Sequence, residues 1–151
     1  MRRCQDSINP RTHPDIMVLS NEDEDPGIEH HPYWYARVIG IFHAHIRHTG
    51  PLSTSPEPQQ VEFLWVRWFG RDLSYPAGWA MCHLHRIGFL PDFDGGAFGF
   101  LDPANVVRGV HLIPAFAHGT TAEYLGLSIA RQHLDKKLPD NEDYVYFYVN
   151  M

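Results

Sequence analysis

The chain has 151 residues, of which 44% are hydrophobic, 13% aromatic and 20% charged, so it fits one domain with a real core and leaves little room for a second. Its formal net charge is −6 with histidine neutral. Free nucleic acid is held mainly by Lys and Arg at its phosphates, so direct nucleic-acid binding by this domain alone is not expected. An acidic balance favours a basic partner, such as a Lys/Arg-rich peptide.

The chain carries the features of an intracellular protein, nuclear or cytoplasmic. Its only two cysteines are Cys4 and Cys82, which predicts no disulfide framework and a reducing compartment. No apolar segment follows the positive charges of residues 1–15, so we expect no secretory signal. No apolar run reaches the ~18 residues of a membrane span, and no membrane partner is expected.

The first half of the chain predicts a polar, partly flexible lead-in over residues 1–29 and a single domain over residues 30–151. Within the lead-in, residues 16–19 form a short apolar run that fits an edge strand. A long strand is expected at Tyr33 to His45, because apolar residues occupy both of its alternating faces. The β-branched and aromatic run Val61 to Phe69 predicts its partner, and the proline-rich segment between them predicts a loop.

The second half continues in short elements with turn signals between them. Asp102 followed by Pro103 predicts one capped helical turn. Thr120 and Glu123 have the spacing of a capping box, which predicts a helix over residues 121–134. Further strands are expected at 81–90, 98–101, 106–117 and 144–149. The order predicts a mostly β fold: a small antiparallel β-barrel with long loops and one C-terminal helix.

Two strand sequences resemble the bromo-adjacent homology module, a barrel-centred chromatin domain. The first is HPYWYARVIGIFHAHI and the second is VEFLWVRWFGRD. A third segment, GFLDPANVVRGVHLIPAF, stands where that module has a return strand, a short turn and a strand leading out. The resemblance covers the middle of the chain and implies a barrel that binds chromatin-derived peptides.

A second resemblance spans about residues 30–150. The phrases that carry it are HPYWYARVIGIFHA, FLWVRWFGRD, LHRIGF, AFGFLDPANVVRGVHLIPAFAHG and YVYFYVN. They resemble a domain that recurs in basidiomycete fungal proteins linked to Plavaka-type and Kyakuja–Dileera–Zisupton-type transposases. This implies a mobile-element setting, in which the chain is expected to be part of a longer protein. No acidic transposase triad can be assigned to residues of this sequence.

Aromatic residues around the two best strands suggest a ligand site. Aromatic faces can hold a methyl-lysine or another cation by cation–π attraction, with a carboxylate nearby. The candidate cage residues are Trp34, Trp68 and Trp79, with Tyr33 and Asp72 in support. The alternative is that most of these rings are core, because alternate residues of a buried strand point inward.

Paired histidines suggest a second kind of site. His43 and His45 are two residues apart in a predicted strand, so both point to one face, and His83 and His85 repeat the spacing. Two such pairs on adjacent strands could bind zinc or another divalent ion. The alternative is that these histidines are ordinary strand-end residues. If these histidines bind no metal, we expect the chain to have no cofactor.

Other constellations predict no catalysis. Asp92 and Asp94 fit a turn better than an acid–base pair, because Asp and Gly stabilise turns locally. Cys82 and His83 are neighbours and would point to opposite faces of a strand. The leading hypothesis is a non-catalytic module that binds a protein or basic peptide. The alternatives are a metal-dependent or metal-stabilised domain and a structural portion of a transposase.

Overall fold

The computed structural model describes residues 8–20, 31–52, 57–131, 138–139 and 141–150. Within these ranges the chain is mostly β, and its helical segments are three short 3-10 turns. None of them has the length and apolar character that a membrane-crossing helix needs. The strands are β1 Asp15–Leu19, β2 Tyr33–Ile46, β3 Gln59–Arg71, β4 Arg86–Phe89, β5 Phe98–Leu101, β6 Val106–Gly109, β7 His111–Pro114, β8 Thr120–Thr121, β9 Asp143–Tyr144 and β10 Phe147–Asn150; the turns are η1 Trp79–Met81, η2 Pro103–Asn105 and η3 Phe116–His118.

The main sheet is antiparallel and follows the order β6-β1-β2-β3-β4-β10-β7, with β5 paired to β3. The small strands β8 and β9 pair separately. The path is open, so the expected small antiparallel β-barrel is not confirmed. Its two end strands, β6 and β7, are consecutive in the chain with only Val110 between them, and the Val110 amide donates to the Asp15 carbonyl at 2.9 Å. The chain thus changes pairing partner at Val110, from β1 to β10.

We call the strands of the main sheet, apart from the outer ends of β2 and β3, the body. Two apolar clusters fill it, because alternate residues of the strands face opposite sides. Met17 of β1 faces the first cluster, and its neighbours Ile16 and Val18 face the second. The first cluster is aromatic, with the Phe69 and Phe89 rings stacked at 4.3 Å. The second is aliphatic and is built mainly from β1, β2 and β3. β1 therefore lies between β6 and β2 and packs on both sides, so the expected edge strand is an interior strand.

Two arginines stand directly opposite each other in the middle of β2 and β3. Arg37 is paired with Asp15 of β1 at 2.8 Å, and Arg67 is paired with Asp143 of β9 at 3.0 Å. Asp143 also binds Arg131 at 3.0 Å, so one carboxylate holds two guanidinium groups. Like charges opposite each other in a sheet are destabilising, and these carboxylates offset that repulsion. Burial lowers the pKa of Arg67, while Asp143 acts against that shift.

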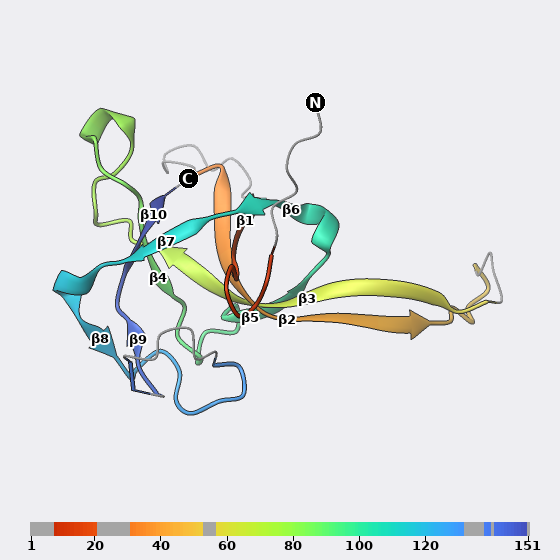
Figure 1. Ribbon diagram of the computed structural model, residues 1–151. Helices are drawn as coiled ribbons and strands as arrows, with labels where there is room; N and C mark the ends of the chain where they lie inside the picture. Colours follow the sequence, from red (N-terminus) through yellow and green to blue (C-terminus); the bar gives the residue numbers. More distant parts are fainter. Residues whose placement is uncertain (1–7, 21–30, 53–56, 132–137, 140, 151) are drawn as a thin grey trace.

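The outer halves of β2 and β3 leave the body as a long two-stranded projection (Figure 1). We call Ile41–Ile46 and Gln59–Phe63 the arm. Within the arm the two strands pair from Phe42 opposite Phe63 to Ile46 opposite Gln59, and Ile41 is opposite Leu64 of the body. The register shifts between Val38 and Gly40, where the strands pass from the body to the arm.

Several predicted elements differ from the structure: the strand expected over 106–117 is divided into β6, β7 and η3, and the one over 144–149 into β9 and β10. Residues 121–131 contain the end of β8 and then turns, so the helix expected over 121–134 is not confirmed; residues 132–134 lie outside the described ranges. The reason is that Thr120 pairs with Tyr144 and donates its hydroxyl to Glu142, which removes the expected cap. The strand expected at 81–90 is confined to β4, because η1 and a left-handed Cys82 (φ 55°) precede it.

Candidate functional site

The residues of the predicted aromatic cage lie in separate parts of the fold. Trp34 and Trp68 are neighbours, with ring centroids 6.0 Å apart and planes at 81°. The Trp68 ring also lies against Gly99, where a Cβ atom would stand 2.9 Å from the indole nitrogen. Tyr33 packs against the aromatic cluster, and Trp79 is 99% exposed in η1. Among the described residues, the structure therefore brings together only the two tryptophans of β2 and β3.

Asp72, the predicted acid of the cage, is engaged by the protein's own arginine. Its carboxylate accepts from Arg86 at 2.6 and 2.9 Å, and from the Ser74 hydroxyl at 2.6 Å. The Arg86 guanidinium carbon lies 4.1 Å from the centroid of the Tyr75 ring and 4.3 Å from that of Tyr146. This is the arrangement expected of an aromatic cage, and an internal cation fills it.

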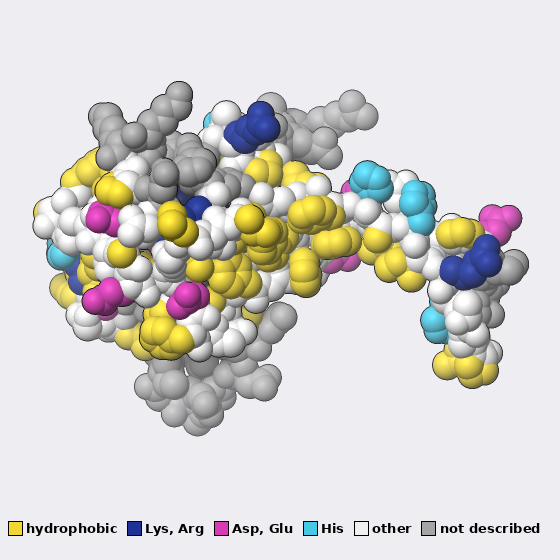
Figure 2. All heavy atoms as spheres, turned by 90° about the horizontal axis from the view of Figure 1, so that it is seen from below, with side chains coloured by type: hydrophobic (Ala, Val, Ile, Leu, Met, Phe, Trp, Pro, Cys, Tyr) yellow, Lys and Arg dark blue, Asp and Glu magenta, His cyan; other side chains and the backbone are white. Residues whose placement is uncertain are grey.

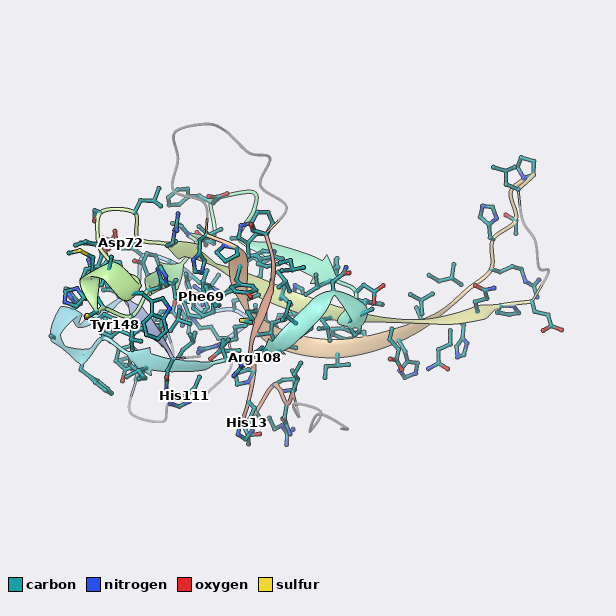
Figure 3. The ribbon with its side chains drawn as sticks, turned by 90° about the horizontal axis from the view of Figure 1, so that it is seen from above. His13, Phe69, Asp72, Arg108, His111 and Tyr148 are labelled. Atoms are coloured by element: carbon teal, nitrogen blue, oxygen red, sulfur yellow. The ribbon has the colours of Figure 1, made fainter. Side chains whose placement is uncertain are left out.

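The electrostatics agree with that geometry. Burial would raise the pKa of Asp72, but hydrogen bonds from Ser74 and Arg86 hold it below its ordinary value. Burial likewise acts to lower the pKa of Arg86, but Asp72 and Tyr148 raise it. Both groups are therefore charged at neutral pH. Figure 3 places Asp72 and Tyr148 at the end of the body that lies away from the arm.

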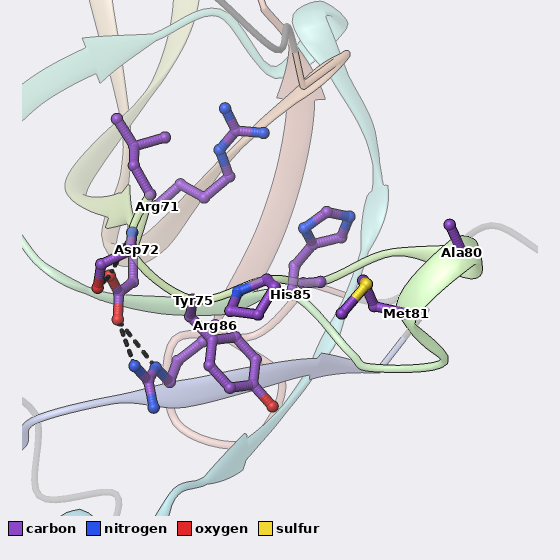
Figure 4. Close-up of a pocket in the computed structure, with 11 residues that line it drawn as sticks. Arg71, Asp72, Tyr75, Ala80, Met81, His85 and Arg86 are labelled. Carbon is purple, nitrogen blue, oxygen red and sulfur yellow. Dashed lines mark hydrogen bonds and ion pairs between the residues drawn. The ribbon is translucent and has the colours of Figure 1, made fainter.

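A cavity of about 680 Å³ opens beside this ion pair (Figure 4). Its charged lining has more positive than negative groups, since two arginines accompany one aspartate. Such a lining does not complement a basic peptide. Its main lining residues are Arg71, Asp72, Tyr75, Met81, His85 and Arg86.

The two predicted histidine pairs do not meet. His43 and His45 lie on one face of the arm, with ring centroids 6.4 Å apart. His83 and His85 precede β4, where the His85 ring is 4.4 Å from that of His31. The His83 ring stacks on Tyr75 at 5.7 Å.

A metal site needs three or four ligands in one place. In the part of the chain that the structure describes, no three His, Cys, Asp or Glu side chains lie together in a group that could hold a metal ion. On the arm His43 has Glu62 as its cross-strand neighbour, but the two do not belong to a group of three. The zinc alternative therefore has no candidate ligand set among these residues.

The arm has one apolar and one polar face, which is the feature that the sequence reading missed. Phe42 stacks on Phe63 at 5.6 Å, and Phe63 meets Phe100 of β5 edge-on at 5.5 Å. Phe42 is 44% exposed and Phe100 is 72% exposed. Figure 2 shows hydrophobic side chains gathered where the arm leaves the body, with histidines farther out. The apolar face of the arm comprises Phe42, Ala44, Ile46, Val61 and Phe63, with Gln59 at its outer end, and Phe100 of β5 continues it onto the body.

The polar face carries His43, His45, Gln60 and Glu62, with Ile41 at its inner end, and these residues alternate with those of the apolar face. Beside β3 an open groove of about 620 Å³ lies between the arm and η2. It is lined by Gln60, Val61, Glu62, Asp102, Pro103 and Ala104. Its charged residues, Glu62 and Asp102, are both acidic and exposed. The alternation in FHAHI was the sequence signal for this surface, but a strand apolar on both faces nearer the body obscured it.

Comparison of the chain with protein-family models, with curated proteins and with solved structures found no match.

Proposed function

We propose that this chain is a non-catalytic protein-interaction module that binds a basic segment of a partner protein on its arm. The observation that carries the proposal is the exposed apolar face of the arm. Monomeric proteins rarely expose contiguous apolar patches of this kind, and such patches mark interaction surfaces. The body does not need this face, because its two clusters are filled by other residues.

The apolar face supplies the binding energy. Burying apolar surface contributes roughly 25 cal/mol per Å², or about 1.5–3 kcal/mol for one large side chain. Phe42, Phe100 and Ile46 are each more than 40% exposed, so each has area left to bury. Aromatic side chains are also enriched in the energetically dominant parts of interfaces.

Charge selects the partner. The chain has a formal net charge of −6, and the carboxylates of the groove beside β3 are those of Glu62 and Asp102. Complementary charge raises the association rate and disfavours wrong partners. A Lys/Arg-rich segment therefore fits the arm better than the cationic cavity near Arg86.

The setting of the proposal comes from the sequence. The resemblance to transposon-associated fungal domains supports a partner within the same mobile-element protein, or a chromatin-derived peptide. A barrel-like body of the bromo-adjacent homology type is part of the same proposal. It is supported by the chain from β6 to β7, which borders β1 on one side and β10 on the other.

The test is a fluorescence anisotropy titration with a labelled peptide of about ten residues that alternates Lys and Val. We expect binding to the protein, and weak or no binding of the matching Glu/Val peptide. Phe42→Ser should weaken the Lys/Val affinity about tenfold, which corresponds to about 1.4 kcal/mol.

The matched control is Leu127→Ser, which removes an exposed apolar side chain (80% exposed) from a body loop. It should leave the affinity unchanged. Equal affinity for the Lys/Val and Glu/Val peptides, or equal losses in the two variants, would refute the proposed function.

A further inference from the structure

We propose that the partner segment binds as an added strand along the outer edge of β3, from Gln59 to Phe63, with Lys/Arg and apolar side chains in alternation. This inference rests on the proposed function and specifies how its surface works. An extended peptide that joins a sheet edge gains affinity from main-chain hydrogen bonds and specificity from alternate side chains.

The edge is open because β5 stops short of it. β5 pairs with β3 only from Arg67 to Leu64. At that point Asp102 accepts a hydrogen bond from the Ala104 amide at 2.9 Å and begins η2, which ends the strand pairing with β3. Pro103 has no amide hydrogen with which to continue the pairing. From Gln59 to Phe63, β3 therefore has a strand on one side only within the described ranges.

The groove lies where β5 would continue. Its lining combines Gln60, Val61 and Glu62 of the open edge with Asp102, Pro103 and Ala104 of the turn that ends β5. A strand placed here would follow the row that β5 already occupies on β3. Neighbouring strands lie ~4.8 Å apart, so the side chains of such a strand would lie beside those of β3 on both faces of the arm.

The two faces define the alternation of the partner. On the apolar face, an added strand would meet Val61 and Phe63, with Phe100 at its end. On the other face it would meet Gln60 and Glu62, and Asp102 stands at the end of the groove where β5 stops. Side chains of a strand alternate between faces, so the structure selects apolar residues at every second position and Lys or Arg between them.

One other edge and one other occupant fit less well. The outer edge of β2 in the arm has the sequence IFHAHI, which carries no carboxylate to attract a basic segment. A second copy of this chain, paired β3 to β3, would bring the Glu62 side chains of two copies to one new interface, and like charges across strands are destabilising.

The experiment uses the Lys/Val peptide in two backbone-methylated forms. One is N-methylated at every lysine and the other at every valine, because alternate amides of a strand point toward and away from the neighbouring strand. We expect one form to lose at least about tenfold in affinity and the other to bind nearly as the parent does. Equal affinities of the two forms would overturn strand addition, while binding of the parent would leave the proposed function intact.

Amide hydrogen exchange of the full protein then locates the edge. With the Lys/Val peptide bound, alternate amides of Gln59–Phe63 should exchange more slowly, and those of Ile41–Ile46 should change little. Glu62→Lys should weaken binding about tenfold, and the control Glu123→Lys, at an exposed body position, should weaken it much less.

Protection along β2 instead of β3 would overturn the assignment. A dimer in sedimentation without peptide, altered by Glu62→Lys, would also overturn the assignment, because the edge of β3 would then bind a second copy of this chain. Absence of any Lys/Val binding would refute the proposed function itself.

Discussion

The body and the arm are made from the same two strands, yet they are held together in different ways. In the body, β2 and β3 have neighbours on both edges and clusters on both faces, and their arginines are paired with carboxylates. In the arm, the same strands have only each other within the described ranges, and aromatic side chains are left exposed.

The contrast separates stability from binding. An isolated two-stranded hairpin is marginally stable in water, so the arm depends on the body for its position. The body gains little from the arm in return. Residues of the body should therefore control unfolding, while residues of the arm should control affinity for a partner.

The largest expected effect is at Asp143, in the body. It binds Arg67 at 3.0 and 3.2 Å and Arg131 at 3.0 and 3.1 Å, so Asp143→Ala leaves two buried cations without their acid. We expect a loss of about 3–5 kcal/mol in the free energy of unfolding. Urea denaturation measures it, with Glu62→Ala in the arm as the control. A loss below about 1 kcal/mol would show that the body does not depend on this pair.

A smaller effect is expected at Asp72. Asp72→Asn removes the charge that Arg86 binds and should cost about 2 kcal/mol at neutral pH. Because the pKa of Asp72 is lowered in the folded state, the unfolded chain binds this proton more readily, and stability falls as pH decreases through the folded pKa. Denaturation between neutral and acidic pH should show that the free energy of unfolding falls less in the variant than in the parent protein. Parallel pH profiles for the two proteins would contradict the ion pair.

Tyr35 should give a signal at high pH. Burial, with a further contribution from Tyr33, raises its pKa to about 12, and its hydroxyl lies 2.8 Å from Nε2 of His31. The folded state thus keeps this proton longer than the unfolded state, so stability should fall as pH rises from the ordinary value of 10 toward 12. Tyr35→Phe should cost about 1 kcal/mol at neutral pH and reduce the alkaline loss. Thermal denaturation at several pH values is the measurement. If Tyr35→Phe loses as much stability above pH 10 as the parent protein does, Tyr35 is not the group responsible.

The arm should behave in the opposite way. Phe42→Ser should lower the free energy of unfolding by less than about 1 kcal/mol, because Phe42 is already partly exposed. The same variant should lose peptide affinity, as proposed above. A loss of stability comparable to that of Asp143→Ala would mean that the arm is part of the core.

The smallest effect is expected from metal. Elemental analysis of the untagged protein should find much less than one zinc per chain, since the two histidine pairs lie in separate places. His43→Ala combined with His83→Ala should leave that content unchanged. One zinc per chain that the double variant loses would revive the metal-dependent alternative.

The sequence predicted the long strands well and the short elements poorly. The strand predicted over Tyr33 to His45 differs from β2 by one residue, since β2 ends at Ile46. β-branched and aromatic runs strongly favour the extended conformation. Asp102 caps its turn as predicted, since that interaction is local. Thr120 failed as a cap because its partner, Glu142, is distant in the sequence.

The candidate site could likewise be predicted only in part from the sequence. Aromatic residues and an acid were predicted to gather, and a cage of that chemistry exists, but its rings belong to Tyr75 and Tyr146 and its cation is Arg86. Tyr146 comes from the far end of the chain, so no local pattern could place it there. The open edge of β3 depends on where β5 stops, which is also a property of the fold.

The most direct test of the division between body and arm is a titration of ¹⁵N-labelled protein with the Lys/Val peptide, followed by amide chemical shifts. We predict that the largest shifts fall on the arm and on the residues around Asp102. Largest shifts around the cavity between Arg71 and Arg86, with the arm unchanged, would contradict the account.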